Sequence, residues 1–127
     1  MEDFDVKVGF NPRILESGSR NEVVMDISVR SQDQKPYWCE CDIKVSPPVS
    51  LAHDKDLPIG RTRIGIVTSV HALTKQVKIY TSQDVVNGDY QITLTVYMYD
   101  EDGAISARKE INETIRCSDI ADKEIVN

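Results

Sequence analysis

The sequence has few aromatic residues and no long apolar run. Aromatic side chains make up 6% of its 127 residues, and hydrophobic residues make up 40%. No run approaches the roughly 18 apolar residues of a membrane-spanning helix, and the acidic N-terminal stretch lacks the pattern of a signal peptide. These absences predict a protein with no membrane insertion, cytoplasmic by default and extracellular only if a leader has been removed.

Basic charge is also scarce. The chain carries 15 Lys and Arg against 21 Asp and Glu, which gives a net charge of −6 at pH 7. Binding to DNA, RNA or anionic lipid depends on neutralising phosphates, so this acidic chain is not expected to bind nucleic acid. Apolar residues at helical spacing are missing over any length that would form a stable helix. The length suits one domain, which we expect to occupy residues 1–127.

Three cysteines, an odd number, exclude a fully paired disulfide scaffold. Cys39 and Cys41 lie two residues apart in a segment with a strand pattern. Their side chains would share one face about 6.6 Å apart, which disfavours a bond between them. We expect three buried reduced thiols that pack as small hydrophobic side chains. A bridge from Cys117 to Cys39 or to Cys41 is the alternative.

What is present is a regular alternation of apolar and polar residues, clearest in residues 90–99. One face would carry Tyr90, Ile92, Leu94, Val96 and Met98, and the other Gln91, Thr93, Thr95, Tyr97 and Tyr99. A strand with one apolar and one polar face belongs to an antiparallel sheet whose outer side meets water. Turn-forming residues flank the segment at 87–89 and 100–103.

Six further segments have strand patterns, at residues 5–10, 22–30, 37–45, 61–69, 76–80 and 104–117. About seven strands at this spacing predict an all-β chain folded as an antiparallel β-sandwich. Pro12 cannot donate to a β-ladder, so this segment is expected to be either an edge strand or the end of one.

The segments between and after these strands give four further expectations. Residues 51–58 have no period and should form either one helical turn or a loop that crosses between sheets. Residues 71–75 should link their two neighbouring strands as a hairpin loop. A bulge or bend is expected near residues 108–110, where charged residues fall on the apolar face. Residues 118–127 should form a frayed tail.

Three segments carry a family resemblance. Residues 8–18 contain a short strand, a proline turn and a glycine, and they lead into a strand rich in Val and Ile. At residues 86–90, Gly88 stands where the chain would turn, and Tyr90 stands where its hydroxyl would reach back to the loop backbone. Residues 99–103 form an acidic turn before an acidic strand that contains Asn.

Together these segments resemble the immunoglobulin-like modules of archaeal and bacterial surface proteins, especially the cell-adhesion-related type called CARDB. The resemblance covers about two thirds of the chain and is weakest at residues 47–75. It implies an immunoglobulin-like β-sandwich with a binding or structural role. It transfers no binding residues, because such modules keep theirs in variable loops. In antibody domains the tryptophan of the corresponding strand is buried. This chain departs from them, because Trp38 falls on the outward side of its strand.

Trp38, Tyr97 and Tyr99 are the candidate interaction surface. All three fall on outward positions of their strands. On neighbouring strands of one sheet they would form an exposed aromatic patch, a feature typical of interfaces. We therefore expect a non-catalytic interaction or structural module that binds a protein partner or a second copy of itself as a homodimer. Pairing of an exposed edge strand is the other mechanism considered.

Asp100 and Asp102 support an alternative, a calcium- or carbohydrate-binding module. Their carboxylates are hard oxygen ligands, but a full calcium site needs about six to eight oxygens, and this loop supplies only a few. The Asp-Gly pair at 102–103 is also a strong hairpin signal. A turn is the favoured interpretation.

The sequence gives little support for an enzyme. His53 and His71 could join the cysteines in a zinc site or a Cys–His nucleophile pair. However, Cys-x-Cys on a strand is poor zinc geometry, and a buried thiol is a poor nucleophile. We expect no catalytic residues and no cofactor, and we assign Gly88, Tyr90 and the three cysteines to structural roles.

Overall fold

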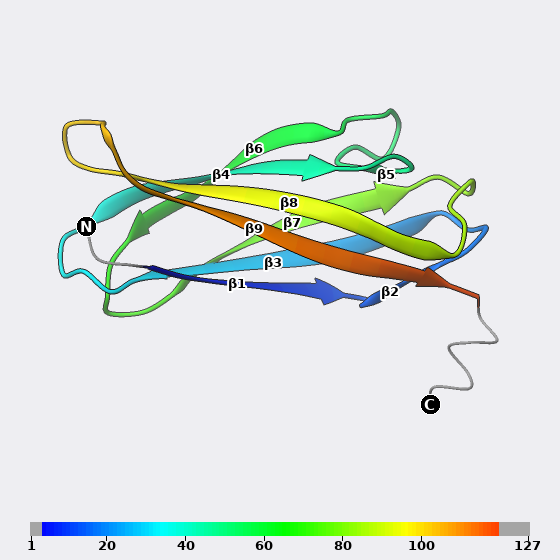
Figure 1. Ribbon diagram of the computed structural model, residues 1–127, viewed down its shortest axis with the longest axis horizontal. Coiled ribbons are helices and arrows are strands. Elements are labelled where there is room, and N and C mark those ends of the chain that lie inside the picture. Colours follow the sequence, from blue (N-terminus) through cyan, green and yellow to red (C-terminus); the bar gives the residue numbers. More distant parts are fainter. Residues whose placement is uncertain (1–3, 120–127) are drawn as a thin grey trace.

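The computed structural model describes residues 4–119 (Figure 1). Nine β-strands run through this part of the chain: β1 (Phe4–Asn11), β2 (Ile14–Glu16), β3 (Asn21–Ser31), β4 (Tyr37–Val45), β5 (Val49–Ser50), β6 (Ile59–Val67), β7 (Leu73–Thr81), β8 (Gly88–Tyr99) and β9 (Ile105–Ser118). No helix occurs between residues 4 and 119, so none there is long and apolar enough to cross a membrane. The all-β prediction is confirmed.

The strands form two sheets that stack as two layers (Figure 1). One sheet has the order β1-β3-β7-β5, and the other has the order β2-β9-β8-β4-β6. The pairings are antiparallel except that of β2 with β9, which is parallel. All seven predicted strands are present. The two additional strands, β2 and β5, have three and two residues and are too short to show a pattern of alternation.

The core lies between the layers and is built from the apolar faces that the alternation predicts. In β8 the side chains of Ile92, Leu94, Val96 and Met98 are all fully buried. Their neighbours in the sequence point to the outer face of the five-stranded sheet. Burying one such aliphatic side chain contributes about 1.5–3 kcal/mol, so the inward face of each strand determines how the layers stack.

Two expectations about the edges and crossings are confirmed. Strand β1 lies at the edge of the four-stranded sheet and ends at Asn11, directly before Pro12. Residues 51–58 contain no helical turn and form the crossing loop, because β5 and β6 belong to different sheets. Ser50 organises this loop: its hydroxyl donates to the Lys55 carbonyl at 2.7 Å and accepts the Leu57 N–H at 2.9 Å.

The predicted hairpin at residues 71–75 is wrong. Strand β6 pairs with β4 in the five-stranded sheet, whereas β7 pairs with β3 in the four-stranded sheet. The chain therefore crosses between the layers after Val67, and β7 begins earlier than predicted, at Leu73. Spacing along the chain predicts that two strands exist but not that they pair with each other.

The bulge predicted near residues 108–110 is also misplaced. Pairing between β8 and β9 is regular there, with Lys109 on the inward side opposite Val96. The Lys109 ammonium donates a hydrogen bond to the Phe4 carbonyl and lies 4.9 Å from the centre of the Phe4 ring. A charged residue on the inner face is accommodated in this way without breaking the strand. The irregularity lies instead at Ser106, because Met98 pairs with Ala107 while Tyr99 pairs with Ile105.

The predicted tail begins too early. Ser118 is the last residue of β9, is only 5% exposed, and accepts a hydrogen bond at its carbonyl from the Ser17 N–H. The parallel pairing of β2 with β9 therefore holds β9 in the sheet as far as Ser118. Asp119 follows β9 without secondary structure, and residues 120–127 of the predicted tail lie outside the described residues.

Candidate functional site

Trp38 and Tyr99 lie side by side on the outer face of the five-stranded sheet. Trp38 of β4 is directly opposite Tyr99 of β8 on one side and Ile66 of β6 on the other. Tyr99 in turn is opposite Ile105 of β9. Residues directly opposite each other in antiparallel strands share a face. These four residues therefore form one line across four strands, which we term the apolar row.

The apolar row is exposed. Trp38 is 38% exposed, Ile66 61% and Ile105 58%. The inward apolar side chains of β4 and β8 are buried, so on these two central strands exposure is confined to the outer face.

Two β-bulges bring Ile66 and Ile105 into the row. In β6, Gly65 pairs with Cys39 but Arg63 pairs with Glu40, so Ile64 is an extra residue. Gly65 has a φ of 122°, in a region that side-chain-bearing residues rarely adopt. The extra residue reverses the alternation after it and turns Ile66 outward. Bulges commonly re-aim a side chain in this way.

The bulge at Ser106 has the same effect in β9, where it turns Ile105 outward. Both isoleucines were absent from the predicted surface, because strict alternation places Ile105 on the inner face. A signal existed for one of them, since an isolated glycine within a strand pattern, here Gly65, indicates a bulge.

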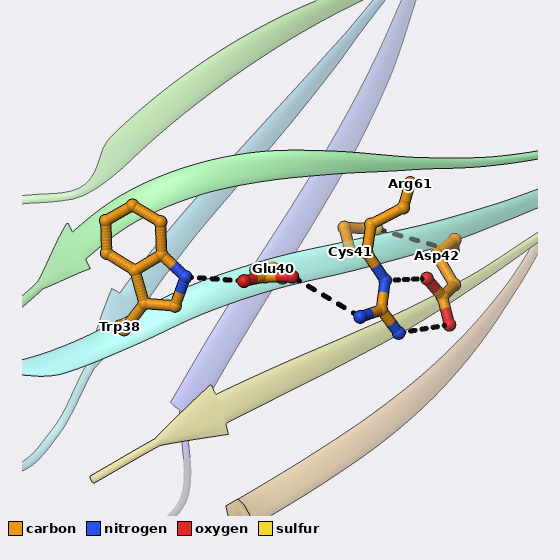
Figure 2. A network of polar contacts seen from close by, with 5 residues as sticks. All are labelled: Trp38, Glu40, Cys41, Asp42 and Arg61. Atoms are coloured by element: carbon orange, nitrogen blue, oxygen red, sulfur yellow. Dashed lines mark hydrogen bonds and ion pairs between the residues drawn. The ribbon is translucent and has the colours of Figure 1, made fainter. Parts of the chain in front are cut away.

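A polar network along β4 holds the Trp38 side chain (Figure 2). The indole Nε1 of Trp38 donates to Glu40 Oε2 at 2.6 Å, and Glu40 Oε1 lies 3.4 Å from Arg61 Nη1. Arg61 also donates twice to Asp42, from Nε at 2.6 Å and from Nη2 at 3.1 Å. These residues alternate on the outward side of β4 and its neighbour β6, so the pleat brings them into one line.

Tyr97 joins the apolar row to this network. Its ring centre is 6.2 Å from that of Tyr99 and 5.6 Å from the Arg61 guanidinium carbon. The Arg61 hydrogen bonds, aided by the positive charge, hold the pKa of the Asp42 carboxyl below its usual value in spite of partial burial. The Asp42 carboxylate and the Arg61 guanidinium are therefore both charged at neutral pH.

A shallow hollow of about 220 Å³ adjoins the row. It is lined by Pro36, Tyr37, Trp38, Ile66, Tyr99, Asp100 and Glu101. The hollow thus combines aromatic surfaces with the carboxylates of the turn between β8 and β9.

That turn contains Asp100 and Asp102, the calcium ligands of the alternative interpretation. Asp100 Oδ1 accepts the backbone N–H groups of Asp102 at 2.9 Å and Ala104 at 3.0 Å, which stabilises the turn. Within residues 4–119, no three His, Cys, Asp or Glu side chains are grouped as a metal ion would require. The geometry is that of a hydrogen-bonded hairpin turn.

The three cysteines are inside the sandwich. Cys39 and Cys41 are free and fully buried, and burial raises the pKa of each thiol to about 12. Cys117 is also buried, but it lies opposite Gly88, whereas Cys41 lies opposite Val96. Gly88 and Val96 are about 26 Å apart along β8, so Cys117 is too far from the other two cysteines to bond to them. The alternative disulfides to Cys117 are therefore not formed.

The histidines are not brought to these thiols. His53 packs its ring edge against Tyr80 of the four-stranded sheet, with ring centres 5.8 Å apart. His71 is exposed in the crossing between β6 and β7.

Tyr90 forms the corner that the family resemblance implies. Its hydroxyl donates to the Val86 carbonyl at 2.7 Å and accepts the Val86 N–H at 3.3 Å. Gly88, between them, has a φ of 151°. The corner fixes the entry into β8, at the far end of this strand from Tyr99.

No family model and no curated protein sequence matches this chain. Among solved structures, it is similar to part of the native alpha-2-macroglobulin of Escherichia coli, with a TM-score of 0.57 and 17% identity over 91% of this chain. The chain spans 7% of the length of that protein. AggA, the major subunit of aggregative adherence fimbriae type I from Escherichia coli, gives a TM-score of 0.47 and 11% identity, over 92% of this chain and 95% of AggA.

The chain is an immunoglobulin-like β-sandwich. The sheet orders agree with this fold, since two mainly antiparallel sheets pack face to face and the chain crosses repeatedly between them. At these identities, the likeness establishes the fold alone.

Proposed function

We propose that this immunoglobulin-like sandwich is a non-catalytic interaction or structural module that acts through the outer face of its five-stranded sheet. The contact surface is centred on Trp38, Tyr97 and Tyr99. The observation that carries this proposal is the position of Trp38 directly opposite Tyr99, on the outer face and partly exposed. Aromatic residues are enriched at protein interfaces because they bury a large area with few rotatable bonds.

The surface is already ordered before any partner arrives. The hydrogen bond from Trp38 to Glu40, and the ion pair from Glu40 to Arg61, hold the indole in one orientation. Fixing a side chain on binding costs about 0.5–1.5 kcal/mol, and an ordered side chain avoids most of that cost. This arrangement favours binding over a purely structural role for the face.

The cysteine chemistry supports a non-catalytic role. A thiol with a pKa of about 12 is protonated at neutral pH, and the thiolate is the nucleophilic form. Cys39 and Cys41 are therefore inert in the folded protein.

The sheet face is a better contact surface than the sheet edges. The edge strand β6 carries a bulge at Ile64, and β1 ends at Asn11, directly before Pro12. Lys75 occupies an inward position of β7 opposite Ile27, in the part of β7 that the short strand β5 does not reach. Bulges, prolines and inward charges are the usual features that prevent strand addition at an edge.

The family resemblance suggests a setting for such contacts. CARDB-type modules belong to cell-surface proteins, and the three resembling segments support a similar role in adhesion or surface assembly for this chain. The partner would then be another protein or a second copy.

A calcium- or carbohydrate-binding role at Asp100 and Asp102 is a second candidate. It is favoured by a hollow of about 580 Å³ at this turn, lined by Lys35, Pro36, Tyr37, Asp100, Glu101, Asp102 and Ser106. It is disfavoured by the two backbone N–H groups that already occupy Asp100 Oδ1.

Sedimentation velocity over a series of protein concentrations tests the contact surface. We expect the wild-type chain to associate as concentration rises, and Trp38→Ser to remain monomeric. Tyr80→Ser is the matched control, since Tyr80 is an aromatic residue on the outer face of the other sheet and should leave association unchanged. A wild-type chain that sediments like Trp38→Ser at every concentration would contradict the proposal.

A further inference from the structure

Two kinds of unpaired charge flank the apolar row. On one side lies the acidic turn, where Glu101 and Asp102 are exposed. On the other side lie Arg63, opposite Glu40, and Arg108, opposite Tyr97, which are also exposed. Within residues 4–119 none of these four charges has an ion-pair partner, in contrast to Arg61.

This arrangement is complementary to itself. Successive residues on one face of a strand are about 6.8 Å apart. Measured along the strands, the two arginines therefore lie about 6.8 Å from the row on one side, and the acidic turn begins about 6.8 Å from it on the other side. A rotation of 180° about the row exchanges the two sides. It lays the acidic turn of one copy over Arg108 of the other and brings the two apolar rows together.

We infer that the partner at this face is a second copy of the chain, related by a two-fold axis along the row Ile66–Trp38–Tyr99–Ile105. This inference rests on the proposed function and specifies its partner and geometry. Each contact occurs twice, as a two-fold interface requires. The rows exclude water at the centre, and each acidic turn forms ion pairs with the arginines of the other copy.

The hollow beside Trp38 gives Arg63 of the second copy a site. Its lining combines the Trp38 and Tyr99 rings with the carboxylates of Asp100 and Glu101. A guanidinium favours this setting because it stacks on aromatic surfaces and forms charge-assisted hydrogen bonds with carboxylates.

The size of the contact predicts a weak association. The overlapping strips are four strands wide and about three outward residues long, which is roughly 400 Å² of each face. A standard stable interface buries about 800 Å² on each partner. The dimer therefore belongs to the transient class, with dissociation constants in the micromolar to millimolar range.

Charge reversal tests the arrangement. In Glu101→Arg the new arginine faces Arg108 of an identical copy, and in Arg108→Glu the new glutamate faces Glu101. Each variant alone should dissociate at least about tenfold more readily than the wild type, because like charges then meet twice in the dimer. An equimolar mixture of the two variants places opposite charges at both contacts, and its association should return to within about threefold of the wild type.

Lys44→Glu is the matched control. Lys44 is on the same outer face but three outward positions from Trp38 along β4, so its reversal should leave the dissociation constant unchanged. All variants are measured by sedimentation and checked for an unchanged melting temperature.

The outcomes separate the two proposals. Trp38-dependent association without rescue in the mixture would overturn the two-fold arrangement and leave the contact surface standing. A wild-type chain that stays monomeric at every concentration would overturn both. Rescue in the mixture, with the control unaffected, would establish the arrangement.

Discussion

Arg61 binds the carboxylate of Asp42 through two hydrogen bonds, 2.6 and 3.1 Å long. The bidentate pair crosses from β6 to β4 and is part of the network that also holds Trp38. It lowers the pKa of Asp42, and that shift makes the stability of the protein depend on pH.

The expected pH dependence follows from the direction of this shift. Because the pKa of Asp42 is lower in the folded chain than its ordinary value of 3.8, the pair stabilises the fold above pH 3.8 and loses this effect as the pH falls through the folded pKa. Arg61→Gln should therefore be slightly less stable than the wild type at neutral pH, and the difference should shrink under acid conditions. Urea unfolding at several pH values measures it. A difference that grows as the pH falls would contradict the assignment.

Tyr90→Phe removes the hydroxyl that bonds twice to the Val86 backbone. We expect a loss of about 1 kcal/mol in the free energy of unfolding, the net value of such hydrogen bonds. Tyr80→Phe is the control, since the ring contact of Tyr80 with His53 survives the change. Equal stabilities for the two variants in urea unfolding would show that the corner does not stabilise the fold.

Gly65→Ala tests the bulge in β6. The φ of 122° is strained for alanine, and the added Cβ would lie 3.4 Å from Leu73 Cδ1. We expect a loss of about 1–3 kcal/mol, measured by thermal unfolding. Gly9→Ala is the control, because Gly9 has no positive φ and a Cβ there meets nothing within 4 Å. A loss at Gly9 as large as that at Gly65 would argue against strain at the bulge.

Cys39 and Cys41 should resist thiol reagents while the protein is folded. Both are fully buried, and their pKa values of about 12 leave almost no thiolate at neutral pH. Labelling with iodoacetamide, followed by peptide mass spectrometry, should find these residues modified only after unfolding in urea. Rapid labelling of either one in the native protein would reopen the case for an enzyme.

Calcium should leave the melting temperature unchanged. Asp100 Oδ1 already accepts two backbone N–H groups, and a calcium site needs about six to eight oxygens. A ligand that binds only the folded state raises the melting temperature by mass action. Thermal unfolding in millimolar calcium, with magnesium as the control, measures this. A rise with calcium alone would favour the second candidate function.

The sequence by itself determined the strands and their faces. Alternation in β8 predicted which of its side chains are buried, because the pleat makes side-chain direction a local property with a period of two. The family resemblance at residues 86–90 implied the corner, and a short segment is enough to carry that motif because its hydrogen bonds span only four residues. The outward direction of Trp38, Tyr97 and Tyr99 was also available from the pattern.

Only the tertiary structure decided which strands are neighbours. It put β6 and β7 in different sheets, revealed the two unpredicted strands β2 and β5, and placed Trp38 opposite Tyr99. It also moved Ile66 and Ile105 to the outer face through bulges that each shift the register by one residue. Pairing and register depend on the combined burial of two layers, and no single segment contains that information.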